Sequence, residues 1–350
     1  MIRIDNTQYS AFTRCPLYWV EQYVNCVRKP FKGGRDDALA IGVAVHDALY
    51  NGYKSGGFSV SNKVMEELNL THEARMEVRS MVEAYRAAYP SGPVELPWTG
   101  LEDPLEYQYN NQVTMVAKLD GHCHVKDPIE IEGGNGTIYL EPGVYAFETK
   151  TKRPGYDRGL YIAEWQAAMQ ASFQTITLRA NAERFGFSPN DVKGVIVNVI
   201  ERPRVYEPRR TCLGCDQMFQ VRLYGQDGKQ YRCPGCGYLN TFRGPMGTSR
   251  VDPPYMWRFA VYRSPERLAT DLQTIAQVAD AMMAARISDS PVAHRTNCVN
   301  VQWRKRCDFY EPHNAVFPVS AIEWPGYEKF NPTAYLEKEE ADGTASVNGS

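Results

Sequence analysis

Four cysteines are the residues whose type and spacing point most directly to a chemistry. The segments "CLGC" at 212–215 and "CPGC" at 233–236 form two C-x-x-C pairs separated by seventeen residues. Each pair can present two thiolates to one ion, and two pairs complete the tetrahedral four-sulfur site typical of structural zinc. Because four thiolates leave no open position for a substrate, we expect Zn²⁺ to hold a fold here rather than to catalyse. The predicted ligands are Cys212, Cys215, Cys233 and Cys236.

A glutamate and a lysine at the end of an apolar run form a second candidate site. In "YAFETKT" at 145–151 the pattern favours a strand, so Glu148 and Lys150 should point to the same face. Upstream, "KLDGH" at 118–122 puts Asp120 at the end of another strand-like run. Carboxylate oxygens suit Mg²⁺ or Mn²⁺, and such an ion lowers the pKa of a bound water and stabilises charge on a phosphate. Lys150 could orient that water or offset charge in the transition state. The alternative for Glu148 and Lys150 is an ordinary surface ion pair.

A histidine on a predicted helix is a candidate third ligand. His46 lies in "GVAVH", within the helical segment "DDALAIGVAVHDALYNGYKSGG". Mn²⁺ accepts imidazole more readily than Mg²⁺ does. Taken alone, the residue also fits a histidine packed in the core or capping the helix.

The hydrophobic patterns predict the elements that must position these residues. Helices are expected at the N-terminus, with Ser10 as cap, and over 36–57, 61–70, 71–89, 160–186 and 264–287. Strands are expected within 103–126 as a hairpin, and at 144–151, 192–201 and 255–264, with a loop or small β-excursion between 129 and 143. This order predicts an α/β (α+β) fold, a mixed central sheet flanked by helices, with a metal-binding insertion at one sheet edge.

Composition bounds the class of protein. The chain has 350 residues, 43% hydrophobic and 23% charged, with a net charge of −2, which is ordinary for a globular protein. No apolar run reaches the ~20 residues of a membrane helix, and the N-terminus lacks a signal-peptide core, so we expect a cytoplasmic protein without a membrane partner. The expected domains are a core over 1–202 and 251–335, a zinc-ribbon insertion over 203–250, and a disordered acidic tail over 336–350.

Five motifs in order resemble the PD-(D/E)XK nuclease superfamily, in its RecB-like branch of phage exonucleases and CRISPR-adaptation nucleases. "YSAFTRCPLYWVEQY" is similar to the opening helix of that branch, and "GVAVH" to its Gly-x-x-x-His motif. "KLDGH" resembles its acid-bearing strand, "YAFETKT" its Asp/Glu-x-Lys strand, and "WQAAMQASF" its Gln-x-x-x-Tyr helix. The resemblance covers about residues 8 to 310 outside the insertion, and implies a restriction-endonuclease-like core.

The resemblance also implies roles for single residues. His46, Asp120, Glu148 and the Thr149 carbonyl would bind Mg²⁺ or Mn²⁺, and Lys150 would be catalytic. Gln170 would contact DNA or orient the site, with Gln166 as the rival for that role. The sequence departs from the family at Lys118, where glycine is commoner nearby, and at Gln174, where a tyrosine is expected. We expect DNA phosphates to be contacted by Lys152, Arg153, Arg209 and Arg210.

Many relatives in this branch carry an iron–sulfur cluster on one N-terminal and three C-terminal cysteines. This chain offers Cys15, Cys298 and Cys307, with His313 in the fourth place. Thiolates are the usual ligands of a [4Fe–4S] cluster, and histidine is an exception. We therefore expect a relic of a lost cluster, or packed cysteines that pin the chain ends together, rather than an intact cluster.

These features together predict a metal-dependent deoxyribonuclease, an exonuclease acting in DNA recombination, repair or degradation in a bacterium or a phage-infected host. DNA is the expected partner, beside a homo-oligomeric or recombination-protein partner. One alternative is a non-catalytic DNA- or protein-binding module that keeps the nuclease fold and the zinc ribbon. Another is a zinc-stabilised interaction protein with no nucleic-acid role, which the near-neutral net charge permits.

Overall fold

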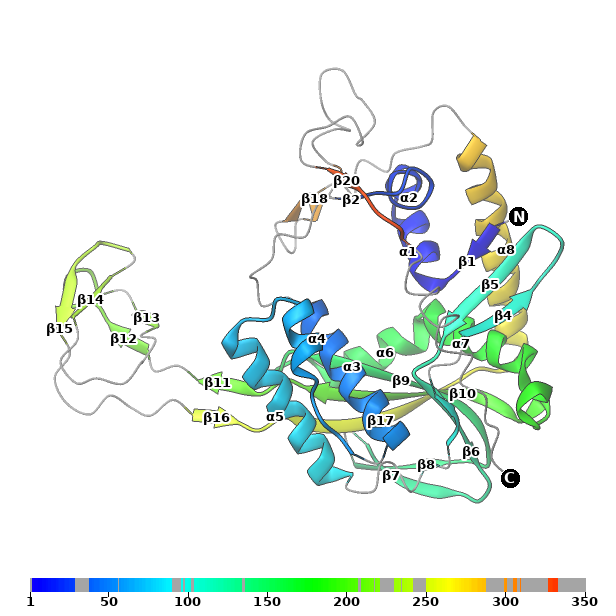
Figure 1. The fold of residues 1–350 in the computed structure, drawn as a ribbon, viewed down its shortest axis with the longest axis horizontal. Coiled ribbons are helices and arrows are strands. Elements are labelled where there is room, and N and C mark those ends of the chain that lie inside the picture. The colour runs from blue at the N-terminus through cyan, green and yellow to red at the C-terminus, as the bar shows by residue number, and fades with distance from the viewer. Residues whose placement is uncertain are drawn as a thin grey trace.

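The computed structural model describes the chain over residues 2–28, 38–55, 57–89, 96, 98–101, 104–133, 136–206, 209–216, 218–220, 230–233, 235–241, 250–287, 299–300, 305–306, 309 and 327–332. Within these ranges the chain is a mixed α/β protein, which confirms the predicted class at that level (Figure 1). None of the described helices is both long and apolar enough to cross a membrane. The α-helices are α1 (Asn6–Arg14), α2 (Pro16–Trp19), α3 (Ala38–Ser55), α4 (Asn62–Glu67), α5 (His72–Ala88), α6 (Arg158–Ala167), α7 (Met169–Ala180) and α8 (Pro265–Ile287).

A seven-stranded sheet lies at the centre, with the strand order β3-β6-β9-β10-β17-β7-β8. β9 and β10 run parallel, and β6 and β17 flank them in the antiparallel direction. β10 is buried over nearly its whole length, as expected for a β-branched central strand. The strands are β3 (Trp98–Leu101), β6 (Gly121–Val125), β7 (Ile129–Gly133), β8 (Gly136–Leu140), β9 (Gly143–Lys152), β10 (Val192–Glu201) and β17 (Tyr255–Tyr262).

Helices cover both faces of this sheet. α6 and α7 pack on the face that carries Ala146 of β9 and Val197 of β10. α3, α4 and α5 pack together on the opposite face, where Ile200 of β10 joins their core. Because successive strand residues point to opposite faces, Glu148 faces α6 and α7, whereas Thr149 faces the α3–α5 side.

The hairpin expected within 103–126 has "TMVAKLDGHCHV", residues 114–125, as its second strand, and the prediction that this run is one strand is wrong. Its first half is β5 (Val113–Lys118), which pairs with β4 (Pro104–Gln108) and β1 (Ile2–Ile4) in a separate three-stranded sheet. Its second half is β6 in the large sheet, so Asp120 lies at the crossing between the sheets. There the Asp120 carboxylate accepts the backbone N–H of Thr149 at 2.6 Å, which draws the crossing onto β9.

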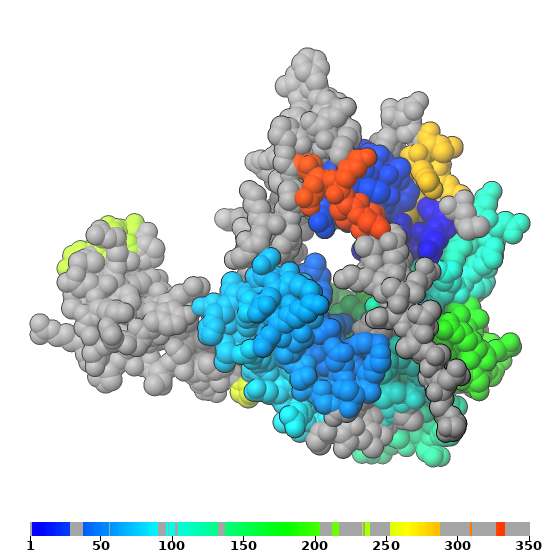
Figure 2. Space-filling view, in the orientation of Figure 1, coloured from blue at the N-terminus to red at the C-terminus, as the bar shows by residue number. Residues whose placement is uncertain are grey.

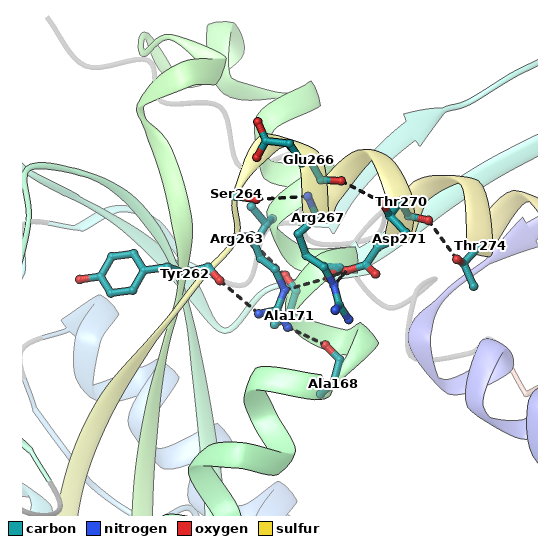
Figure 3. Close-up of polar contacts among 12 residues, drawn as sticks. Ala168, Ala171, Tyr262, Arg263, Ser264, Glu266, Arg267, Thr270, Asp271 and Thr274 are labelled. Carbon is teal, nitrogen blue, oxygen red and sulfur yellow. Dashed lines mark hydrogen bonds and ion pairs between the residues drawn. The ribbon is translucent and has the colours of Figure 1, made fainter.

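The helix predicted over 160–186 is also divided. Ala168 takes an extended conformation (ψ 131°) that ends α6 and starts α7. The buried Arg263, which follows β17, donates from Nη2 to the carbonyl of Ala168 at 3.0 Å (Figure 3). It also donates from Nη2 to the carbonyl of Trp165 at 3.3 Å. The carbonyls at the break thus gain a guanidinium partner from a residue distant in the sequence, which stabilises the division of this helix.

The N-terminal helix has a different cap from the one predicted. Ser10 lies inside α1, and Asp5 caps it by accepting the N–H of Gln8 at 2.8 Å. The helix stops at Cys15, whose extended backbone is imposed by the proline that follows. The helices predicted over 61–70, 71–89 and 264–287 are confirmed as α4, α5 and α8, the last with Ser264 accepting the N–H of Arg267 at 3.2 Å.

The cysteine insertion leaves from the middle of the large sheet, not from a sheet edge as expected. It follows β10 and precedes β17, which are neighbours inside the sheet. β11 (Arg204–Tyr206) and β16 (Arg250–Asp252) pair at the base of the insertion. The strands β12 to β15, between which the cysteines lie, are to one side of the large sheet and its helices (Figures 1 and 2). The remaining strands are β12 (Arg209–Thr211), β13 (Met218–Gln220), β14 (Gln230–Arg232), β15 (Leu239–Thr241), β2 (Val27–Arg28), β18 (Val299–Asn300), β19 (Lys305–Arg306) and β20 (Glu328–Lys329).

Candidate functional site

Glu148 and Lys150 lie side by side on the sheet face covered by α6, as the alternation along β9 predicts. Lys150 Nζ forms an ion pair with Glu148 Oε1 and lies 5.8 Å from the centre of the Trp165 ring. The Glu148 side chain is only 6% exposed, whereas that of Lys150 is 34% exposed. Glu148 is therefore a buried acid, and Lys150 is the member of the pair that reaches solvent.

Two glutamines from α7 hold the Glu148 carboxylate. Gln170 Nε2 donates to Oε1 at 2.8 Å, and Gln174 Nε2 donates to Oε2. Residues four apart share one helix face, so both reach the same acid. Gln166, the rival for this role, is exposed on α6. The structure brings Gln170 to the site and adds Gln174, which the motif pattern concealed because a tyrosine was expected there.

Asp120 and His46 approach the same end of β9 from other elements. His46 Nδ1 lies 3.3 Å from Asp120 Oδ1, with side chains 28% and 24% exposed. Gly42, one helical turn before His46, sits close to β9, because a Cβ there would lie 3.3 Å from Thr151 Oγ1. The glycine in "GVAVH" therefore lets α3 approach β9 closely enough to bring His46 to Asp120.

The ionisable groups shift one another's pKa values. Burial lowers the pKa of His46, but the Asp120 and Glu148 carboxylates outweigh it and raise the pKa to about 8. Burial acts to raise the pKa of Asp120, yet His46, the Thr149 N–H and Lys150 bring it below its usual value. Burial raises the pKa of Glu148 despite the attraction of Lys150. Burial also opposes the charge of Lys150, but Glu148 raises the pKa of that ammonium. Glu148 is thus the more easily protonated of the two acids.

A row of buried polar side chains crosses the other face of the sheet behind the site. Asn198 of β10 donates from Nδ2 to Thr149 Oγ1 at 3.4 Å and accepts from Arg258 Nε of β17 at 3.1 Å. Arg258 is 1% exposed and also donates to the hydroxyl of Tyr85 on α5 at 3.2 Å. Tyr85 in turn shares a hydrogen bond with Tyr53 of α3. This row ties β9 to α5 and to α3, the helix that carries His46.

The predicted Mg²⁺ or Mn²⁺ ligands gather at one end of β9 without converging on one point. Among the described residues, the four cysteines form a group whose ligand atoms all lie within 4.8 Å of one another, and no other group of three or more His, Cys, Asp or Glu side chains does so. His46, Asp120 and Glu148 do not form such a group, because the carboxylate of Glu148 faces Lys150 and the glutamines. The donor types, oxygen and imidazole, still suit a hard divalent cation.

The four predicted zinc ligands do converge. Cys212 Sγ lies 3.6 Å from Cys236 Sγ, and Cys215 Sγ lies 3.8 Å from Cys233 Sγ. A disulfide would need ~2.05 Å, whereas zinc–sulfur bonds of ~2.3 Å in a tetrahedron place the sulfurs about 3.8 Å apart. The sulfur–sulfur distances in this structure match those around zinc and not that of a disulfide, and all four cysteines are free thiols. The cluster can therefore bind a metal ion such as zinc.

The two C-x-x-C turns have the same local form. Gly214 N–H donates to Cys212 Sγ at 3.3 Å, and Gly235 N–H donates to Cys233 Sγ at 3.4 Å. The residue after each second cysteine has a positive φ, 58° at Asp216 and 72° at Gly237. Backbone N–H groups that donate to a ligand atom help to orient it, so each turn holds the sulfur of its first cysteine in a defined position.

The other predicted residues lie in several places. Lys152 Nζ sits over the Tyr161 ring at 4.2 Å, and Arg153 is exposed just after β9. Cys15 is buried at the junction of α1 and α2. Arg209 and Arg210 lie on β12, whose side chains are outside the described part of the structure, and Cys298, Cys307 and His313 are outside the described residues altogether.

No protein-family model and no curated protein matches this chain. The function of the chain is therefore inferred from its own residues.

Proposed function

We propose that the chain is a metal-dependent deoxyribonuclease built on a restriction-endonuclease-like core, and that it acts as an exonuclease of the PD-(D/E)XK superfamily. The observation that carries the proposal is the assembly of Asp120, Glu148 and Lys150 at one end of β9 with His46 and Gln170 beside them. These residues lie in four separate segments of the sequence, each of which resembles a motif of that branch. Two acids that can hold a divalent ion, with a lysine beside them, supply the groups with which a metal-activated water can cleave a phosphodiester.

Each residue has a distinct task in this proposal. Asp120, Glu148, His46 and the Thr149 carbonyl would hold Mg²⁺ or Mn²⁺ at this end of β9. Such an ion, when bound, lowers the pKa of a water molecule and offsets charge on phosphate. Lys150, the more exposed member of its pair, would orient that water or donate to a phosphate oxygen.

The glutamines give the acid a defined position. Gln170 and Gln174 each donate to a different oxygen of Glu148, so the carboxylate is oriented even though it is buried. An acid fixed by two amides loses little freedom when a ligand arrives, which favours a preorganised site. The same bonds would have to loosen on one oxygen for that oxygen to face an ion.

One observation favours a second candidate, a DNA-binding module without catalysis. Both oxygens of Glu148 already have partners, and Glu148 does not form a convergent set with His46 and Asp120. If this arrangement persists when a divalent ion is present, the residues stabilise the fold and the ion pair is structural. Cleavage separates this candidate from the nuclease.

The test is cleavage of end-labelled linear DNA and closed circular DNA with Mg²⁺, with Mn²⁺ and with EDTA. Wild type is compared with Lys150→Met, which keeps the aliphatic stem against Trp165 but removes the charge, and with Lys63→Met, which removes an exposed lysine on α4. We expect metal-dependent loss of linear DNA by wild type and Lys63→Met, and a loss of rate of at least about 100-fold in Lys150→Met. Cleavage of circles as well would make the enzyme an endonuclease with the same chemistry.

Two results would contradict the nuclease. Wild type that cuts neither substrate with either ion leaves the binding module as the function. Lys150→Met that cuts at the wild-type rate removes Lys150 from the active site. Thermal melting of each variant checks that the protein is folded at the assay temperature, because Lys150→Met leaves the buried Glu148 without its charged partner.

A further inference from the structure

Alternating cations and aromatic rings continue along the sheet from the candidate active site. Lys152 Nζ lies 4.2 Å from the centre of the Tyr161 ring and 4.7 Å from that of Tyr156. The Arg158 guanidinium lies 4.3 Å from the centre of the Tyr255 ring and 5.5 Å from that of Trp257. The rings of Tyr161 and Trp257 are 6.0 Å apart and join the two halves. We call this set of residues the cation–aromatic ladder: Lys152, Tyr156, Arg158, Tyr161, Tyr255 and Trp257.

The register of the strands places the ladder next to the site on the same face. Lys152 follows Glu148 and Lys150 at two-residue spacing on β9, so all three point to the α6 side. In the next row across the sheet, Lys152 of β9 pairs with Glu201 of β10, and Glu201 pairs with Tyr255 of β17. At ~3.3 Å per residue this row lies about 13 Å from Glu148 along the strand. The same strand ends lead into β11 and β16, the base of the cysteine insertion.

The ladder has a buried middle and exposed ends. Tyr161 is 4% and Trp257 is 2% exposed, and they belong to the core between α6 and the sheet. Tyr156 and Tyr255 are 41% and 39% exposed. Packing in the core accounts for the two buried rings. It does not account for Tyr156 and Tyr255, because each of these rings keeps a large area open to solvent and has a cation beside it.

We infer that the ladder is a binding platform for single-stranded nucleic acid, on which unpaired bases stack against Tyr156 and Tyr255. Phosphates of the same strand would contact Lys152 and the exposed Arg153. Base stacking on exposed aromatic rings beside backbone-tracking cations is how proteins hold single strands without reading their sequence. The single strand would be the substrate of the nuclease proposed above, so this inference rests on that function. Binding to the platform does not require cleavage.

The charges around the ladder favour a single strand over a duplex. The hydroxyl of Tyr156 donates to the exposed Glu164 at 2.7 Å, and Asp157 caps the start of α6 nearby. Glu201 is engaged by Arg158 at 3.1 Å and by Trp257 Nε1 at 2.9 Å. Acids so close to the platform repel phosphates, and a duplex carries about twice as many phosphates per unit length as a single strand. The bases of a duplex are also stacked on one another and cannot reach the rings. Unpaired bases can reach them.

The experiment measures binding without added Mg²⁺ or Mn²⁺, so that nothing is cleaved while the structural zinc stays in place. Fluorescence anisotropy uses three labelled probes of about 12 nucleotides: a mixed-sequence single strand, the same strand with central abasic sites, and a blunt duplex. The proteins are wild type, Tyr156→Ala/Tyr255→Ala, Tyr156→Phe/Tyr255→Phe, and the control Tyr139→Ala, which removes a 66% exposed tyrosine on β8.

Stacking predicts a specific pattern of losses. Removal of one base–ring stack weakens binding at least about fivefold, so the double alanine variant should bind the single strand at least about 25-fold more weakly. The double phenylalanine variant and Tyr139→Ala should bind within about twofold of wild type, because the rings of the platform remain. The abasic strand should bind wild type weakly and lose little more in the alanine variant.

Three results would overturn the platform. They are wild type that does not bind the single strand, an alanine variant that binds it within about twofold of wild type, and equal losses on single strand and duplex. Each outcome is separable from the cleavage test. Cleavage with no effect of the alanine variant on binding removes the platform and keeps the nuclease, whereas binding lost in that variant without cleavage by wild type keeps the platform and removes the nuclease.

Discussion

Replacement of Asp120 by asparagine tests whether the electrostatics of the site are as the geometry indicates. Asparagine retains an oxygen that can accept the Thr149 N–H, which the carboxylate accepts at 2.6 Å, but it has no charge. The Asp120 carboxylate raises the pKa of His46, 3.3 Å away, from 6.5 to about 8 against the opposing effect of burial. In Asp120→Asn we therefore expect the pKa of His46 to fall to 6.5 or below.

The same change alters how stability depends on pH. The rise in the pKa of His46 from 6.5 to about 8 corresponds to about 2 kcal/mol. Because the folded value lies above the unfolded one, this stability is fully present below about pH 6.5 and is lost as the pH rises through about 8. Asp120 is ionised throughout this window, since its pKa is lowered. The variant should therefore lose about 2 kcal/mol more of its unfolding free energy at pH ~6 than at pH ~9.

Two measurements on protein without added Mg²⁺ or Mn²⁺ check this expectation. Histidine ring resonances followed by NMR against pH give the pKa of His46, which is assigned with His46→Gln. Urea unfolding at the two pH values gives the free energies. Asp127→Asn, which neutralises an exposed acid after β6, is the control and should change neither quantity. A pKa of His46 in Asp120→Asn within about 0.5 of the wild-type value would refute the proximity of the two charges.

Two further substitutions test other parts of the structure. Cys212→Ser should remove the metal from the four-cysteine cluster, so elemental analysis should fall from about one zinc per chain in wild type to near zero; zinc-free wild type would refute the zinc site. Arg258→Met should lower the unfolding free energy by at least about 2 kcal/mol in urea, because it leaves Asn198 and Tyr85 without their buried charged donor. Arg86→Met, on the exposed side of α5, should change it by less than about 0.5 kcal/mol, and equal effects of the two would refute the role of the buried row.

Local pattern was sufficient for much of the architecture. The strand that carries Glu148 and Lys150, the buried strand at 192–201 and the helices α4, α5 and α8 follow from residue spacing and from capping or breaking residues. The convergence of Cys212, Cys215, Cys233 and Cys236 was likewise readable, because each C-x-x-C pair sets its own turn geometry within a few residues.

Where the prediction failed, partners distant in sequence were decisive. The helix break at Ala168 is stabilised by Arg263, almost a hundred residues later, and nothing in the apolar pattern of 160–186 marks it. The strand break at Asp120 is set by a hydrogen bond to Thr149 on another strand. In both places a polar group satisfied across the fold outweighed the local periodicity.

Residue types alone determined that an acid–lysine pair, a second acid and a histidine are present and that a four-thiolate site can form. Only the tertiary structure decided that Glu148 is buried and held by Gln170 and Gln174, and that its oxygens face these partners rather than His46 and Asp120. The physical reason is that spacing along a strand or helix fixes the direction of a side chain, whereas burial and pKa depend on which distant elements pack against it.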